Sequence, residues 1–134
     1  MPKGIDPTQE SEGFNAGLAV RRAVVGEDYV AQALENADEL SIPLQKLVTE
    51  GAWGMVWTRE ELGRRERSVA TVAMLAALGR EEELKLHLRG ARRNGLSAVE
   101  LREIVLQVCI YAGFPAGLAA FRVLRDVLQR EENA

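Results

Sequence analysis

The segment from Val69 to Leu78 is apolar on every side, and it constrains the fold more than any other stretch. It reads Val-Ala-Thr-Val-Ala-Met-Leu-Ala-Ala-Leu and follows a charged start at Arg64. A helix that is apolar all round has to be buried all round. A chain of 134 residues has little core in which to hide one helix completely. We therefore expect this helix to pack both in an internal core and against another subunit.

Helical patterns cover most of the remaining chain, and no stretch alternates apolar and polar residues long enough to indicate a strand. Capping-box spacing occurs at Ser97 with Glu100 and at Thr58 with Glu61, and Ser41 also precedes a helical pattern. Both tryptophans lie in a glycine-containing stretch, residues 51–58, that we expect to be an irregular packed connection. We expect helices over residues 11–25, 28–38, 41–50, 64–78, 81–94, 97–112 and 115–128.

The fold class that follows is all-α, a single-domain helical bundle. Residues 1–10 are polar and contain proline, so we expect a flexible N-terminal arm there and the helical domain over residues 11–131.

Charge and cysteine content exclude several classes of function. The net charge is -3 and the isoelectric point is about 5.3, which disfavours non-specific binding to nucleic acid or to a membrane surface. A helix-turn-helix pattern over residues 91–105 has mixed charges, which argues against DNA binding. Cys109 is the only cysteine, so no intrachain disulfide or CxxC chemistry is possible. No apolar run is long enough for a membrane span, and the expected location is cytoplasmic.

The single histidine, His87, has a carboxylate one helical turn before it, at Glu83. Residues four apart share a helix face, and a neighbouring carboxylate favours the protonated imidazole. This pair is therefore a candidate acid–base site, although a histidine at the edge of a core is an equally simple interpretation. One histidine and one carboxylate supply two metal ligands, which is too few for a metal site.

Arginines and aromatic residues form a second group of candidates. Arginine binds carboxylates through two parallel hydrogen bonds, while aromatic side chains can line an apolar pocket with polar edges. Salt-bridged arginines and packing aromatics are the alternative interpretation, and it applies to most of the charged run. The candidates for binding substrate are Arg22, Arg59, Arg67, Trp53, Trp57 and Tyr111.

Two sequence blocks, Phe14 to Gly26 and Ala52 to Arg59, resemble the carboxymuconolactone decarboxylase family, and specifically its stand-alone members. The N-terminal helix, residues 14–26, and the double-tryptophan block, residues 52–59, separate these members from the wider alkylhydroperoxidase D-like superfamily. Blocks that follow in the expected order are Arg67-Ser68, residues 82–89, Asn94-Gly95 and residues 111–115. Two features depart from related patterns. Glu60 and Glu61 replace a Pro-Gly pair, and Arg80 and Glu83 occupy the cysteine positions of the peroxidase relatives, which excludes dithiol chemistry.

The resemblance implies an oligomeric all-α fold, commonly a homohexamer built as a trimer of dimers. It also implies cofactor-free decarboxylation of a lactone dicarboxylate, 4-carboxymuconolactone, to 3-oxoadipate enol-lactone in protocatechuate catabolism. In that reaction His87 would supply the proton or the oxyanion contact and Glu83 would orient it. Two alternatives stay open: a non-catalytic binding or scaffold protein of the same fold, and a decarboxylase or isomerase of a related lactone.

Overall fold

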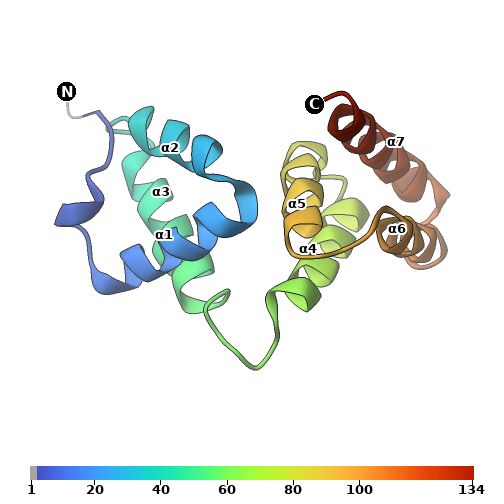
Figure 1. The fold of residues 1–134 in the computed structure, drawn as a ribbon, viewed down its shortest axis with the longest axis horizontal. Helices are drawn as coiled ribbons and strands as arrows, with labels where there is room; N and C mark the ends of the chain where they lie inside the picture. The colour runs from blue at the N-terminus through green and yellow to red at the C-terminus, as the bar shows by residue number, and fades with distance from the viewer. Residues whose placement is uncertain (1–2) are drawn as a thin grey trace. The chain divides into compact units, whose positions relative to one another are not determined.

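The computed structural model describes residues 3–134, and in this range the only regular secondary structure is helical. The all-α prediction is therefore confirmed for the described residues. The helices form two compact units, one ending at Gly63 and the other beginning at Arg64, a division that no shift in composition had indicated (Figure 1). The expected boundaries of an arm over residues 1–10 and a domain over residues 11–131 stay predictions.

The first unit is built on α1, whose N-terminus is capped by Ser11 through a 3.0 Å bond from the Phe14 N–H to its hydroxyl. The segment before α1 is hydrogen-bonded to the chain around α2. The Gly4 N–H donates to the Ala37 carbonyl at 2.6 Å, and the Ile5 N–H donates to the Leu34 carbonyl at 3.0 Å. The elements of this unit are η1 (Pro7–Gln9), α1 (Glu12–Val25), α2 (Glu27–Glu35), α3 (Ile42–Leu47) and the π-helix η2 (Val48–Gly54).

The tryptophan segment differs from the sequence-based expectation. Instead of an irregular connection, the chain continues from α3 as a π-helix through Gly54. The expected capping box at Thr58 is wrong as well, because the Thr58 hydroxyl donates back to the Gly54 carbonyl at 2.6 Å and no helical turn begins there. Ser41 does not cap α3 either, since its hydroxyl accepts the N–H of Asp38.

Close approach of backbones joins α1 to η2. A Cβ atom added at Gly17 would overlap the Thr49 carbonyl oxygen and lie 2.6 Å from the Gly54 nitrogen. A Cβ at Gly54 would lie 2.6 Å from the Gly13 carbonyl oxygen. Only glycine permits this separation, so Gly17 and Gly54 determine how closely the tryptophan segment packs on the first helix.

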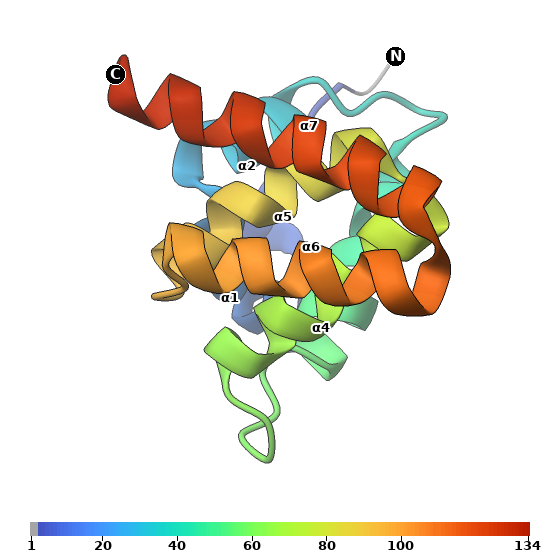
Figure 2. The same ribbon diagram turned by 90° about the vertical axis from the view of Figure 1, so that its right-hand side faces the viewer.

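The second unit packs four helices around one apolar core, whose fully buried side chains include Val72, Leu88 and Leu101. The predicted capping box is confirmed at the start of α6, where Ser97 and Glu100 exchange two 3.0 Å bonds. Figure 2 shows α6 and α7 side by side. Gly113 lies between the end of α6 and the start of α7. The helices are α4 (Arg64–Leu78), α5 (Glu81–Arg93), α6 (Ala98–Ala112) and α7 (Phe114–Glu132).

Helix α4 is not buried all round within its own unit. Ser68, Val72 and Ala76 are buried, whereas 56% of Met74 and 67% of Leu78 are exposed. The apolar run therefore presents one side to the core of the second unit and leaves another side uncovered by that unit.

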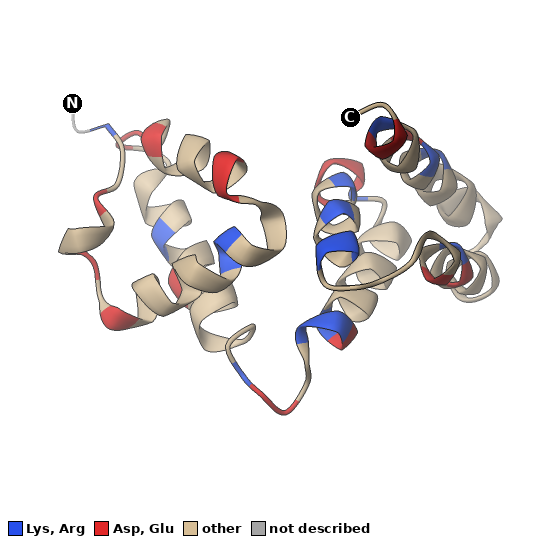
Figure 3. Ribbon diagram, in the orientation of Figure 1, with Lys and Arg blue, Asp and Glu red and all other residues tan. Residues whose placement is uncertain are grey.

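The two units differ in charge. Acidic side chains outnumber basic ones in the first unit, while arginines predominate in the second, most visibly on α5 (Figure 3). Within residues 3–134, every helix is too short or too polar to cross a lipid bilayer.

Candidate active site

His87 lies half-buried on α5, between the buried side chains of Leu84 and Leu88. Burial lowers the pKa of His87 below its ordinary value of 6.5, and the negative charge of Glu83 raises that pKa by a smaller amount. Glu83 thus favours the protonated ring, as expected, but desolvation disfavours a charged imidazole more strongly. The balance of the two effects favours the neutral imidazole, and Glu83 itself is exposed to solvent.

Arg67 lies in the first turn of α4. Two other arginines of this turn, Arg64 and Arg65, make contacts within the second unit. Arg65 forms an ion pair with Glu100, the residue that also caps α6. Arg64 offers its backbone carbonyl to the side chain of Asn94. Arg67 is half-buried. The salt-bridge interpretation therefore holds for Arg65, and the role of Arg67 in binding substrate stays a prediction.

The adjacent arginines of α1 have different surroundings. Arg21 is only 5% exposed, and its Nη1 donates to Gln45 Oε1 at 2.9 Å and to Thr49 Oγ1 at 3.1 Å. Burial lowers the pKa of Arg21, although the group stays a cation at neutral pH. Arg22, the next residue of the helix, is exposed. Arg21 thus hydrogen-bonds to the π-helix through Thr49. Of these two arginines, only Arg22 has its guanidinium accessible to a dissolved ligand.

Trp53 and Trp57 lie together at the end of the tryptophan segment. Their ring centroids are 4.8 Å apart with the planes tilted by 36°. Trp53 is buried within η2 and Trp57 is half-buried just beyond it. A tilted pair at this separation is a favourable aromatic contact, so the two rings form one surface. π-Helical turns frequently occur at functional sites, and this one carries two candidate residues.

Arg59 follows the tryptophans in the exposed turn. Its Nη2 lies 3.8 Å from Glu61 Oε1, and both side chains are mostly exposed. Glu61 is one of the two acidic residues that stand where the resembled family has Pro-Gly. The replacement of Pro-Gly therefore places the Glu61 carboxylate near the Arg59 guanidinium, which was predicted to bind a carboxylate of the substrate.

Tyr111 is 84% exposed near the end of α6. It lines an apolar groove of about 400 Å³ between α4 and α6, together with Met74, Ala73 and Ile104. Neither tryptophan lines this groove. Tyr111 therefore belongs to an apolar surface of the second unit.

The eight predicted site residues thus fall into two sets of four. The first unit carries Arg22, Trp53, Trp57 and Arg59, and the second carries Arg67, Glu83, His87 and Tyr111. Two pairs are brought together within a unit, namely the tryptophans and Glu83 with His87. The sequence analysis assigned no role to Arg21, Ser68 or Asn94. Arg21 donates to Gln45 and Thr49 in the first unit, and Asn94 donates to Ser68 in the second. Among residues 3–134, no three His, Cys, Asp or Glu side chains gather where they could hold a metal ion.

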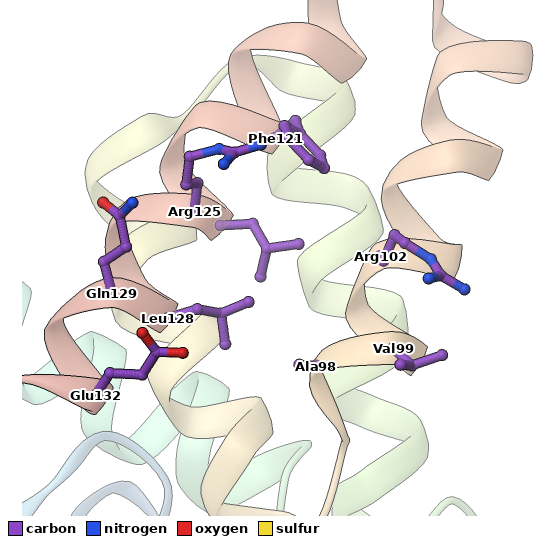
Figure 4. Close-up of a pocket in the computed structure, with 9 residues that line it drawn as sticks. Ala98, Val99, Arg102, Phe121, Arg125, Leu128, Gln129 and Glu132 are labelled. Carbon is purple, nitrogen blue, oxygen red and sulfur yellow. The ribbon is translucent and has the colours of Figure 1, made fainter.

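A separate groove of about 420 Å³ lies between α6 and α7, and none of the eight predicted residues lines it. Figure 4 shows Leu128 and Phe121 on one side and Val99 on the other. The Arg125 guanidinium lies 5.1 Å from the centre of the Phe121 ring. This groove is a feature of the helix pair and contains neither the histidine nor its carboxylate.

Comparison with known proteins identifies the family. The sequence profile of the carboxymuconolactone decarboxylase family matches residues 43–126, which run from α3 into α7. The chain belongs to the carboxymuconolactone decarboxylase family. It is 41% identical over 120 residues to the 4-carboxymuconolactone decarboxylase of Acinetobacter baylyi, covering 90% of each chain. It is also 41% identical over 115 residues to the nitrosuccinic acid decarboxylase of Metarhizium robertsii, covering 86% of this chain and 80% of that protein. The family predicted from the sequence is confirmed.

Proposed function

We propose that this chain decarboxylates 4-carboxymuconolactone to 3-oxoadipate enol-lactone in the catabolism of protocatechuate. The observation that carries the proposal is the 41% identity to the Acinetobacter enzyme over 90% of both chains. The single histidine is half-buried on α5, where burial lowers its pKa, and it supplies a group suited to the chemistry.

The reaction is one that amino-acid side chains can support directly. The bond between the ring γ-carbon and its carboxylate breaks, and carbon dioxide leaves. The electron pair enters the conjugated ring and reaches the lactone carbonyl oxygen as a dienolate. One proton then adds to the α-carbon, which yields the enol-lactone. Because the conjugated lactone accepts the electrons, we propose no cofactor.

We assign the proton or the oxyanion contact to His87. A neutral imidazole can donate a hydrogen bond to the developing oxyanion, a contact typically worth about 3–4 kcal/mol. To donate a proton to carbon it must first become imidazolium, and a bound dianion favours that by raising its pKa. Glu83 acts in the same direction.

The pH dependence of kcat/KM separates these two roles, because this constant reports ionisations of the free enzyme. If His87 must be protonated, kcat/KM falls about tenfold for each pH unit above its lowered pKa. If the neutral ring contacts the oxyanion, kcat/KM stays level from pH 7 to pH 8.

The arginines and aromatics complete the proposed site. Arg22, Arg59 and Arg67 are the candidates to hold the acetate arm and to orient the carboxylate that leaves, since guanidinium groups match carboxylates in geometry. An apolar wall at Trp53, Trp57 or Tyr111 would disfavour the localised carboxylate charge relative to the spread charge of the transition state.

The test is incubation of the purified protein with 4-carboxymuconolactone while carbon dioxide and the enol-lactone are measured. Release of both in equal amounts supports the proposal. A folded protein that releases neither would favour the alternative, a non-catalytic binding or scaffold protein of the same fold. Arg67→Ala is expected to raise KM about tenfold or more, and an unchanged KM would remove Arg67 from the substrate-binding residues.

A second candidate substrate follows from the Metarhizium relative, a nitrosuccinic acid decarboxylase. Nitrosuccinate and 4-carboxymuconolactone share one arrangement, in which a single carbon bears the departing carboxylate, an acetate arm and an electron-withdrawing group. Loss of carbon dioxide from nitrosuccinate sends the electron pair into the nitro group, and protonation of carbon then gives 3-nitropropionate. Parallel assays with both acids, at equal concentration, would decide which one this chain prefers through the ratio of kcat/KM values.

We also propose that the chain works as a homo-oligomer, a hexamer arranged as a trimer of dimers, in the cytoplasm. Uncovered apolar side chains on α4 and α6 support self-association, since patches of this kind mark protein interfaces. They include Met74, Leu78, Leu106, Ile110 and Tyr111, all more than half exposed. Sedimentation of the wild type against an Ile110→Glu variant tests this, and a wild-type monomer at micromolar concentration would contradict it.

A further inference from the structure

A directional polar contact links the end of α5 to the beginning of α4. The Asn94 side-chain Nδ2 donates to Ser68 Oγ at 2.9 Å and lies 3.4 Å from the Arg64 backbone carbonyl. Ser68 has no exposed surface, and Asn94 is half-buried directly after the last residue of α5. A buried hydroxyl without a partner costs about 1–3 kcal/mol, so Ser68 and Asn94 depend on each other.

This contact acts on the backbone that carries Arg67. Arg64 and Ser68 bracket the first turn of α4, and Arg67 lies inside that turn. Because one acceptor is a backbone carbonyl, the Asn94 amide holds the turn itself and not only a side chain.

The same residue is rigidly connected to the histidine. Asn94 follows His87 by seven residues, which is two turns along one face of the helix. The rest of the contact between α4 and α5 is largely apolar, with Val72, Leu88 and Ala91 in one core. Apolar contacts are non-directional and tolerate small slides, whereas a hydrogen bond weakens steeply with distance and angle.

We propose that Asn94, acting through Ser68 and the Arg64 carbonyl, is a positioning residue that sets the place of Arg67 relative to His87. It touches no substrate. Its effect falls on the guanidinium that binds a carboxylate, and therefore on substrate affinity more than on the chemical step. The proposal rests on the proposed function for its kinetic consequences, while the placement of Arg67 can be measured without turnover.

The experiment compares Asn94→Ala with Asn133→Ala. Asn133 is a matched control, because it also ends a helix of the second unit but is exposed at the end of α7. Asn94→Ala is expected to raise KM about tenfold with kcat within about threefold of wild type, and Asn133→Ala to change neither more than twofold. Ser68→Ala, a milder change, is expected to act in the same direction if Asn94→Ala folds poorly.

A double-mutant cycle then tests whether the effect passes through Arg67. In an Arg67→Ala background, Asn94→Ala is expected to change KM less than twofold, because the group that it positions is gone. Equal losses in both backgrounds would assign Asn94 a general structural role and overturn the proposal.

A turnover-independent measurement is the NMR resonance of the Arg67 Nε–H group. It is expected to shift in Asn94→Ala and in Ser68→Ala, and to stay in place in Asn133→Ala. A resonance unchanged in the first two variants would overturn the proposal. If the wild type decarboxylates neither acid, the proposed function fails, and this resonance alone decides whether Asn94 positions Arg67.

Discussion

Replacing Gly17 by alanine should uncouple the tryptophan segment from α1. The added Cβ would overlap the Thr49 carbonyl oxygen and lie 2.6 Å from the Gly54 nitrogen, whereas ordinary contact begins at about 3.4 Å. Both neighbours are backbone atoms of η2, so neither can turn away as a side chain could. The two helices must move apart by roughly 1 Å, and the close packing around them is lost.

The magnitude follows from two opposing effects. Overpacking a well-filled core costs about 1–3 kcal/mol and occasionally more, and two backbone clashes place Gly17→Ala at the upper end. Alanine in a helix recovers about 0.5–1 kcal/mol relative to glycine. We therefore expect a net loss of about 2 kcal/mol in the free energy of unfolding.

Gly51→Ala is the matched control, because it lies in the same π-helix and its Cβ would meet only the Leu47 side chain at 3.8 Å. It is expected to leave stability unchanged or to raise it by up to about 1 kcal/mol. Urea unfolding followed by tryptophan fluorescence is the assay, since both tryptophans of the chain lie in or beside η2. Unfolding free energies of the two variants within about 0.5 kcal/mol of each other would refute the close-approach argument.

Four further predictions concern the proposed site and its support. His87→Ala should lower kcat by about 10²–10⁴-fold while circular dichroism stays native, and near-wild-type turnover would exclude His87 from the chemistry. Burial lowers the pKa of His87, so the folded protein binds fewer protons than the unfolded chain. Stability should therefore fall as pH drops below 6.5 toward the lowered pKa. In His87→Gln the urea midpoint should change less with pH over that range. Arg21→Met should cost about 1–3 kcal/mol in urea unfolding because Thr49 and Gln45 lose their donor, whereas Arg22→Met should stay within about 0.5 kcal/mol; equal losses would contradict the assigned roles. Glu61→Gln should lower KM less than about fivefold by releasing Arg59 from a weak exposed pair, and a raised KM would show that Glu61 assists binding.

Local signals in the sequence predicted much of the fold. Ser97 with Glu100 marked the start of α6, and Gly26 and Gly113 marked helix ends with φ near 100°. These features depend on residues within one turn of each other, so pattern reasoning can detect them. The π-helix escaped prediction because Thr49 and Gly54 of η2 pack closely against Gly17 of α1, and these residues lie far apart in the sequence.

The chemistry of individual candidates depended on burial, which the sequence does not contain. Arg21 and Arg22 are neighbours of the same type, yet one is buried against Thr49 and the other is exposed. Glu83 was visible one turn from His87, but the larger influence on the imidazole is desolvation by surrounding side chains. Tertiary packing therefore determines which arginine is accessible and which influence on the His87 pKa is larger.

The π-helical register of η2 also makes chain length, and not only residue type, a determinant of this site. A π-turn closes its hydrogen bond one residue later than an α-turn, so it accommodates one additional residue. Deleting a single residue between Val48 and Gly51 would therefore let the segment relax to α-helical spacing while the following side chains keep their direction. Inserting one residue, which the π-turns have no further room to absorb, would instead rotate the following side chains by about 100°. The buried Trp53 would then leave its present position, and the aromatic pair would be redirected without any substitution.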